Sequence, residues 1–247
     1  MRLFSCILVF LAFMFGNAHA SRQQFTVSTP GGRILIESFG NCAKATCPAV
    51  LILSGSKGFG AIAYDEISKT FRAAGLNVYL VHVLSPADID AIATATDARA
   101  RIVFYAQRLP EWISAVQGVA AYLEGQPRHG GKVGVLGISL GAQIAAAATV
   151  GRADIDAVVL VDGAFPNGYS QPVRSLPPLL LIWGSADRTF PLSTGRELQR
   201  TIQQLGGSVA FNVYEGGAHD FFLRSASPIA EAAHRNAADF LAAHLLR

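Results

Sequence analysis

The chain has 247 residues, of which 51% are hydrophobic and 15% are charged, and its formal net charge at pH 7 is +3. A chain with this apolar balance can bury a sizeable core. Because the net charge is small and no run of Lys or Arg is present, the composition argues against a nucleic-acid-binding surface.

The first twenty residues have the pattern of a secretory signal peptide. Arg2 gives a positive start, residues 3–15 are almost all apolar, and Ala18-His19-Ala20 fits a cleavage site. The apolar run is short for a bilayer span, although an uncleaved membrane anchor is the alternative. We therefore expect a periplasmic or secreted protein in which residues 21–247 form a single domain, with no membrane contact after cleavage.

Two cysteines follow this segment, Cys42 and Cys47. In an exported protein, a close pair of cysteines predicts a local disulfide, which here closes a very small loop. A metal pair or two free thiols are the alternatives, but no nearby histidine or further cysteine completes a metal site. We therefore expect no metal at this position.

Strand patterns alternate with helical patterns along the rest of the chain. A hairpin is predicted from residues 25–28 and 34–39, and further strands are predicted at residues 49–53, 77–83, 133–136, 157–161, 179–183 and 208–214. Residues 49–53, 77–83 and 179–183 are expected to be buried strands. The alternation predicts a mostly parallel, twisted sheet of about eight strands with helices on both faces.

Two of the helical segments need comment. Residues 85–109 have no clear period, and we expect a partly helical segment that folds over the top of the sheet as the one candidate lid. Pro110 is expected to open the next helix, in which Trp112, Val116, Val119 and Leu123 share a face.

The strongest motif is Gly137-Ile138-Ser139-Leu140-Gly141, between an apolar strand and an alanine-rich helix. G-x-S-x-G in a strand–turn–helix context is the pattern of a nucleophile elbow. The glycines permit a tight turn, which is expected to expose the Ser139 hydroxyl at the top of the sheet. The Leu140 amide, at the start of the helix, is expected to face an anion that forms beside the serine.

An acyl-transfer serine needs a base, and the base needs an acid that orients it. Asp187 and His219 each follow a late predicted strand, where the carboxyl ends of parallel strands meet. The chain order Ser, Asp, His is that of α/β-hydrolases. Asp162 is a rival acid, because it also follows a strand. His82 is expected to be structural, and loop or helix-surface positions are expected for His129, His234 and His244.

Three segments together carry a family resemblance: G-I-S-L-G, I-W-G-S-A-D-R-T-F-P and Y-E-G-G-A-H-D-F-F. From about residue 49 onward, the chain resembles the dienelactone hydrolase branch of the α/β-hydrolase superfamily. In that branch the acid sits in a G-x-x-D turn with a proline a few residues on, and the histidine sits in a Y-x-G-x-x-H-x-F stretch. The resemblance implies Ser139 as nucleophile, Asp187 as acid and His219 as base, with no metal or organic cofactor.

One position departs from the family pattern. Dienelactone hydrolases proper use a cysteine in the elbow, whereas this chain has Ser139 and is similar to the members that act as esterases. The expected partner is therefore a small-molecule ester rather than a dienelactone. The expected mechanism is hydrolysis through an acyl-enzyme. A small serine peptidase or amidase of the same fold, and a hydrolase-like binding protein without catalysis, are the alternatives.

The second oxyanion donor is expected from the loop after residues 49–53. In the family this loop often reads H-G-x, and here Ser54 and Gly55 occupy the first two positions. The Ser56 amide is the first choice of donor and the Lys57 amide the second. The Lys57 side chain either meets a substrate carboxylate or is solvated.

Several further residues have two possible locations. The pocket mouth or a solvated helix face is expected for Arg99, Arg101, Tyr105 and Arg108, and the core or the pocket wall for Trp183 and Phe190.

Overall fold

The computed structural model describes residues 22–247, except residues 41 and 43. The predicted signal peptide, residues 1–20, lies outside the described residues. Within the described part of the chain, no helix is both long and apolar enough to cross a membrane.

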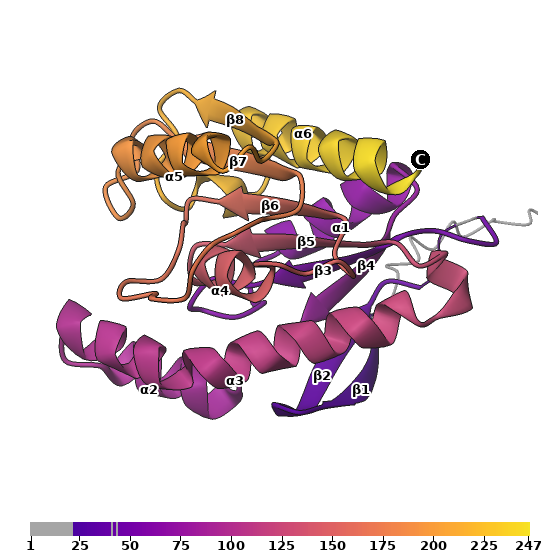
Figure 1. Ribbon diagram of the computed structural model, residues 1–247, viewed down its shortest axis with the longest axis horizontal. Coiled ribbons are helices and arrows are strands. Elements are labelled where there is room, and N and C mark those ends of the chain that lie inside the picture. The colour runs from indigo at the N-terminus through magenta and orange to yellow at the C-terminus, as the bar shows by residue number, and fades with distance from the viewer. Residues whose placement is uncertain (1–21, 41, 43) are drawn as a thin grey trace, which may run out of the picture.

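One eight-stranded sheet runs through the protein, with the strand order β1-β2-β4-β3-β5-β6-β7-β8 (Figure 1). The hairpin β1–β2 and the pair β2–β4 are antiparallel, and every other neighbouring pair is parallel. The predicted mostly parallel sheet of about eight strands is therefore confirmed. The strands are β1 (Gln23–Thr29), β2 (Gly32–Ser38), β3 (Ala49–Leu53), β4 (Asn77–Val81), β5 (Val133–Ile138), β6 (Ala157–Val161), β7 (Leu179–Gly184) and β8 (Val209–Tyr214).

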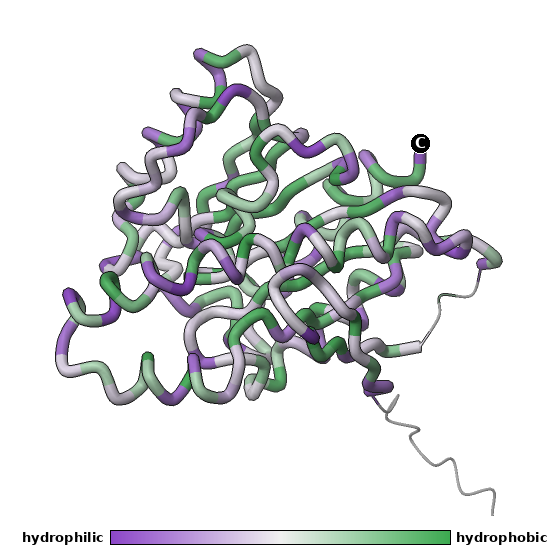
Figure 2. Tube along the Cα trace, turned by 60° about the horizontal axis from the view of Figure 1, so that its bottom comes forward, coloured by the Kyte–Doolittle hydropathy of each residue, from purple (hydrophilic) through white to green (hydrophobic). Residues whose placement is uncertain are grey.

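The strands β3 to β7 are buried along their whole length, which explains their unbroken apolar sequences. They form the hydrophobic centre of the molecule (Figure 2). Side chains alternate between the two faces of each strand. In β3, Val50 and Ile52 pack in the hydrophobic cluster on one face, while Leu51 and Leu53 pack in the cluster on the other.

Helices cover both faces of the sheet, as predicted. Residues of α1 (Ala63–Ala73) and α6 (Pro228–Leu245) pack in one hydrophobic cluster. The opposite cluster contains residues of α3 (Ala98–Glu124), α4 (Leu140–Ala148) and α5 (Leu192–Gln204). The short α2 (Pro86–Thr94) precedes α3, and two 3₁₀ turns follow at η1 (Pro127–His129) and η2 (Phe221–Leu223). Figure 1 shows α3 running the length of its face of the sheet.

The prediction that Pro110 opens a helix is wrong, because Pro110 lies inside the 27-residue α3. The helix begins earlier, where the Asp97 side chain caps it by accepting a hydrogen bond from the Ala100 N–H at 2.8 Å. A proline inside a helix removes one backbone hydrogen bond and costs about 3 kcal/mol. Tertiary packing offsets this cost, since Trp112, Val116 and other residues beyond the proline are buried. Residues 85–109 are thus α2 and the first half of α3.

Two histidines expected on loops or helix surfaces are in fact buried. His129 is 1% exposed, and its Nε2 lies 2.9 Å from the Tyr79 hydroxyl. His234 is also 1% exposed, and its Nε2 lies 2.7 Å from the Phe222 carbonyl oxygen. Tyr79 is 50 residues from His129, and Phe222 lies 12 residues before His234 in the preceding element. Both contacts therefore reach beyond the few residues that a local sequence pattern covers.

A disulfide joins Cys42 to Cys47, as the sequence predicts. It lies in the connection between β2 and β3. The Cys47 N–H donates to the Arg128 carbonyl and the Cys42 N–H to the Asn77 side chain, so the small loop is anchored to two other segments.

Candidate active site

The residues singled out by sequence all follow strands at the carboxyl edge of the sheet. Ser139 follows β5, Asp187 follows β7 and His219 follows β8, while Ser56 lies in the loop after β3. This edge is where parallel α/β sheets place their sites. In the strand order, β5 lies between β3 on one side and β7 and β8 on the other. Ser139 therefore stands between the loop that carries Ser56 and the loops that carry Asp187 and His219.

Ser139 sits in a strained turn between β5 and α4, with φ of 54° and ψ of −113°. A residue other than glycine rarely adopts a positive φ, so the surrounding packing must hold Ser139 in this conformation. That packing requires the two glycines of the motif. A Cβ at Gly137 would lie 2.3 Å from the Gly141 carbonyl oxygen, and a Cβ at Gly141 would lie 2.3 Å from the Leu53 carbonyl oxygen. The G-x-S-x-G spacing is therefore a steric requirement of this turn.

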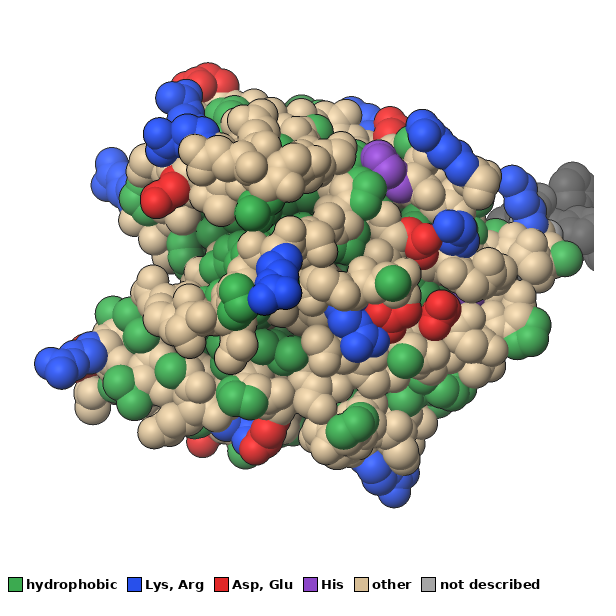
Figure 3. Space-filling view, in the orientation of Figure 1, with side chains coloured by type: hydrophobic (Ala, Val, Ile, Leu, Met, Phe, Trp, Pro, Cys, Tyr) green, Lys and Arg blue, Asp and Glu red, His purple; other side chains and the backbone are tan. Residues whose placement is uncertain are grey.

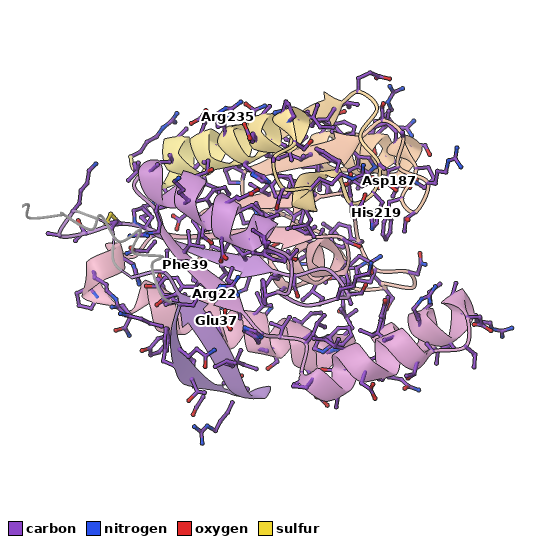
Figure 4. The ribbon with its side chains drawn as sticks, turned by 180° about the vertical axis from the view of Figure 1, so that it is seen from behind. Arg22, Glu37, Phe39, Asp187, His219 and Arg235 are labelled. Atoms are coloured by element: carbon purple, nitrogen blue, oxygen red, sulfur yellow. A yellow bond between two sulfur atoms is a disulfide. The ribbon has the colours of Figure 1, made fainter. Side chains whose placement is uncertain are left out.

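Ser139, His219 and Asp187 form a continuous hydrogen-bonded chain. The Ser139 Oγ lies 2.8 Å from His219 Nε2, and His219 Nδ1 lies 2.8 Å from Asp187 Oδ2. Figure 4 shows the Asp187 and His219 side chains next to each other. An ionised carboxylate only accepts hydrogen bonds, so Nδ1 carries the proton and Nε2 is left to accept from the serine hydroxyl. A serine and imidazole so arranged can exchange a proton.

The backbone around Asp187 fixes its carboxylate. Asp187 is 6% exposed, and its Oδ1 accepts hydrogen bonds from the N–H groups of Thr189 at 2.7 Å and Phe190 at 2.9 Å. The second oxygen is thereby free for His219. The Phe190 ring lies beside the imidazole, with the two ring centroids 5.6 Å apart and the ring planes tilted by 35°. The D-R-T-F-P segment after β7 forms the backbone turn that supplies these two N–H groups.

The rival acid, Asp162, lies close by but makes no hydrogen bond to the histidine. Its backbone has a φ of 47°, and its Oδ1 accepts from the Gly184 N–H at 2.9 Å. Its Oδ2 is buried and finds no partner among the described residues. Burial raises the pKa of Asp162 to about 8, and the negative charges of Asp187 and Asp220 add to this effect. The histidine is thus bonded to Asp187 and not to Asp162, whose raised pKa favours the neutral form of that carboxyl.

Asp162, Asp187 and His219 also form the one group of potential metal ligands found within the described residues, with ligand atoms within 4.8 Å of one another. Two of these residues are already joined to each other by the hydrogen bond between His219 Nδ1 and Asp187 Oδ2. The same imidazole also faces the Ser139 hydroxyl, an arrangement that suits proton transfer.

The two expected oxyanion donors flank Ser139. Leu140 is the first residue of α4, where backbone N–H groups lack helical acceptors. The loop after β3 lies against the elbow, because a Cβ at Gly55 would be 3.6 Å from the Ser139 Cβ. Ser56, Lys57 and Leu140 all line the same cavity as Ser139. Within the described residues, neither the Leu140 N–H nor the Ser56 N–H donates a backbone hydrogen bond.

This cavity has a volume of about 650 Å³. Figure 3 shows a hollow lined with hydrophobic side chains between the part carrying α5 and the part carrying α2 and α3. Of the four residues expected at a pocket mouth or on a solvated helix face, Arg101 and Tyr105 line the cavity, whereas Arg99 is exposed and Arg108 pairs with Asp88.

The two aromatic candidates divide between core and cavity. Trp183 is fully buried in the core, and Phe190 lines the cavity. Sequence reasoning missed the other cavity residues on α2 and α3, including Ile89, Ile92 and Ile102, because they belong to no motif. The one sequence feature that could have pointed to these cavity residues was the position of residues 85–109 directly after a predicted strand of the sheet.

The sequence model of the dienelactone hydrolase family matches residues 39–245. A search of curated proteins finds no match. Among solved structures, a putative dienelactone hydrolase from Klebsiella pneumoniae is 13% identical, with a TM-score of 0.72 over 90% of this chain and 98% of that one. A dienelactone hydrolase from Anabaena variabilis is 20% identical, with a TM-score of 0.66 over 91% and 99%. An esterase from Pyrobaculum calidifontis is 16% identical, with a TM-score of 0.67 over 90% and 85%. At these identities the structures show a shared fold.

Proposed function

This chain belongs to the dienelactone hydrolase family and is a hydrolase of the α/β-hydrolase fold, and on that premise we propose that it is a serine hydrolase of small carboxylic esters. The observation that carries the proposal is the hydrogen-bonded chain Ser139–His219–Asp187, with both links at 2.8 Å, at the edge of a 650 Å³ cavity. A neutral serine hydroxyl is a weak nucleophile, and a base at this distance is what activates it.

The proposed reaction has two steps. In the first, His219 Nε2 takes the proton of Ser139 Oγ as that oxygen attacks the ester carbonyl, and Asp187 stabilises the imidazolium. The negative oxygen of the tetrahedral intermediate accepts hydrogen bonds from the Leu140 and Ser56 amides. His219 then returns the proton to the leaving alcohol, and Ser139 remains acylated.

In the second step, a water attacks the acyl-enzyme while His219 Nε2 takes its proton. The tetrahedral intermediate collapses, the carboxylic acid leaves, and the proton returns to Ser139 Oγ. Each amide donor of such a hole contributes about 3 kcal/mol of barrier lowering. The strained elbow keeps the serine and the Leu140 amide in fixed relation through both steps.

The test uses a fluorophosphonate probe and p-nitrophenyl acetate on three proteins: wild type, Ser139→Ala and Ser193→Ala. Ser193 is the matched control, because it is an exposed serine on α5 that does not line the cavity. Wild type and the control should be labelled and active, while Ser139→Ala should lose the label and at least about 10³-fold in kcat/KM. A Ser139→Ala variant that keeps the wild-type rate would refute the assignment of this serine.

The same protein distinguishes the alternatives. Turnover of a chromogenic aminoacyl amide in preference to p-nitrophenyl acetate would indicate a peptidase or amidase. A wild-type protein that is never labelled would indicate a binding protein without catalysis, because phosphonylation requires an activated serine.

We also propose that the protein is exported, to the periplasm or the medium. The Cys42–Cys47 disulfide is compatible with an oxidising compartment. Cell fractionation and N-terminal mass spectrometry test this, and the expected mature protein begins at Ser21. Recovery of the full chain with free thiols in the cytosol would contradict it.

A further inference from the structure

One wall of the active-site cavity comes from α2 and the first half of α3. Its lining is largely apolar and includes Ile89 and Ile92 from α2 and Ile102, Tyr105 and Ala106 from α3. Ile102 is 42% exposed, so a large hydrophobic side chain faces the cavity without cover. An uncovered apolar wall beside polar groups is typical of a ligand-binding site.

This wall is coupled to the loop that carries Ser56. A Cβ at Gly58 would lie 2.9 Å from the Ile89 Cδ1, so the loop backbone packs directly on α2. Gly58 also has a φ of +70°, a conformation that favours glycine. A displacement of α2 would therefore move both the apolar wall and the loop that carries Ser56 beside Ser139.

A buried carboxylate holds the two helices together. Asp88 of α2 is 3% exposed and accepts hydrogen bonds from the Ser85 N–H at 2.9 Å, Arg108 Nε at 2.8 Å and Trp112 Nε1 at 3.3 Å. Burial would raise the pKa of Asp88, but the hydrogen bonds from Arg108, Ser85 and Trp112 lower it overall, so the group stays charged. This charge has no contact with the cavity.

The position of these contacts matches the weak point of α3. Pro110 lacks an N–H, so the Ala106 carbonyl loses its helical donor, and helices bend most readily at such a point. Asp88 binds Arg108 on one side of the proline and Trp112 on the other. The carboxylate thus braces the helix across its least stable turn.

We propose that α2 and the first half of α3 form a subsite for an apolar arm of the substrate, an aliphatic acyl or alcohol group, and that Asp88 is the positioning residue that fixes this subsite. The proposal rests on the proposed ester hydrolysis at Ser139 and specifies its substrate class. The contacts of Asp88 with Arg108 and Trp112 explain why a buried charge lies behind the apolar wall of the cavity. They also explain why Pro110 inside α3 does not disrupt that wall.

The test compares kcat/KM for p-nitrophenyl hexanoate and p-nitrophenyl acetate, which share a leaving group and differ in acyl length. Each buried methylene is worth about a fourfold gain in binding. We expect wild type to prefer the hexanoate at least tenfold. Ile102→Ser should lower this preference at least fivefold. Val103→Ser is the matched control, since Val103 is a neighbouring exposed hydrophobe of α3 that does not line the cavity; it should keep the wild-type preference.

The alcohol arm is tested with hexyl acetate against ethyl acetate, and a length preference in either series supports the subsite. No length preference in either series would overturn the proposal. So would a preference for the p-nitrophenyl monoester of glutaric acid over the hexanoate, because Lys57 and Arg101 also line the cavity. If wild type hydrolyses acetate and is labelled at Ser139 but shows no length preference, only this inference fails. If it is neither labelled nor active, the proposed function fails instead.

The brace is tested with Asp88→Asn, and Asp90→Asn on the exposed side of α2 is the control. Asp88→Asn should lower the hexanoate preference at least fivefold while the control keeps it, measured where circular dichroism shows both fully folded. A general loss of stability would lower both rates alike and leave the ratio unchanged. If Asp88→Asn does not fold, Arg108→Met removes the guanidinium that pairs with Asp88, at a side chain that is partly exposed. This variant should shift the ratio in the same direction. An unchanged ratio in the folded variant would overturn the role of Asp88.

Discussion

Asp162 provides a prediction whose magnitude follows from the structure. It is fully buried at the end of β6, with one carboxyl oxygen bonded to the Gly184 N–H and the other without a partner among the described residues. Burial raises its pKa to about 8 in the folded protein, against about 3.9 for an aspartate in an unfolded chain. We predict that Asp162→Asn makes the protein more stable than wild type at neutral and alkaline pH.

The sign follows from proton binding. Below about pH 4 the carboxyl is protonated in both states and carries no penalty. Between about pH 4 and 8 the unfolded chain ionises while the folded one keeps its proton, so wild-type stability falls by about 1.4 kcal/mol per pH unit. The full penalty at pH 8 is at most about 6 kcal/mol. Asparagine cannot ionise, and its side-chain oxygen can still accept from Gly184, so the variant avoids this loss.

The assay is urea unfolding followed by tryptophan fluorescence at pH 5, 6, 7 and 8, since Trp112 and Trp183 are both buried. The difference in free energy of unfolding between variant and wild type should grow by several kcal/mol over this range. Other titrating groups cancel in that difference. Asp239→Asn, on the exposed side of α6, is the control and should give a constant difference. A constant difference for Asp162→Asn as well would refute the reasoning.

Three further predictions concern other parts of the chain. Asp187→Asn should lower kcat for p-nitrophenyl acetate on the order of 10³- to 10⁴-fold, because an amide does not hold the required imidazole tautomer; a loss below tenfold would show that His219 is oriented by another group. Replacing Cys42 and Cys47 together by serine should lower the free energy of unfolding in urea by about 2 kcal/mol, because the disulfide closes a short loop; equal urea midpoints would contradict this. Tyr79→Phe should cost about 1–2 kcal/mol by leaving the buried His129 Nε2 unpaired, and thermal unfolding at pH 8 should show a lower Tm; an unchanged Tm would mean that the histidine finds a new partner.

Local patterns in the sequence are enough to predict the strands and the G-x-S-x-G elbow. An apolar run such as β3, bounded by small polar residues, predicts a strand buried on both faces, and the structure buries every residue of it. The elbow could be predicted because a strand, a tight turn and a helix are each set by neighbouring residues. The disulfide could be predicted for the same reason, since its two cysteines are only five residues apart.

Contacts between distant segments were beyond such patterns. Asp162 and Asp187 both follow a strand, and the sequence favoured Asp187 only through a family resemblance. The structure distinguishes them by the hydrogen bond of Asp187 to His219. Local preference predicts a helix start at Pro110, because a proline inside a helix is disfavoured. The Asp88 carboxylate and the buried face beyond the proline reverse that preference.

By itself, then, the amino-acid sequence determined the order of strands and helices and which residues stand at the strand ends. Periodicity and turn chemistry act over a few residues, so they can be read along the chain. Only the tertiary structure decided which of those ends meet, which carboxyl stays protonated, and that α2 and α3 wall the cavity. Those outcomes depend on distances and burial between segments far apart in sequence, such as Ser139 and His219, and such distances are set only when the helices pack on the sheet.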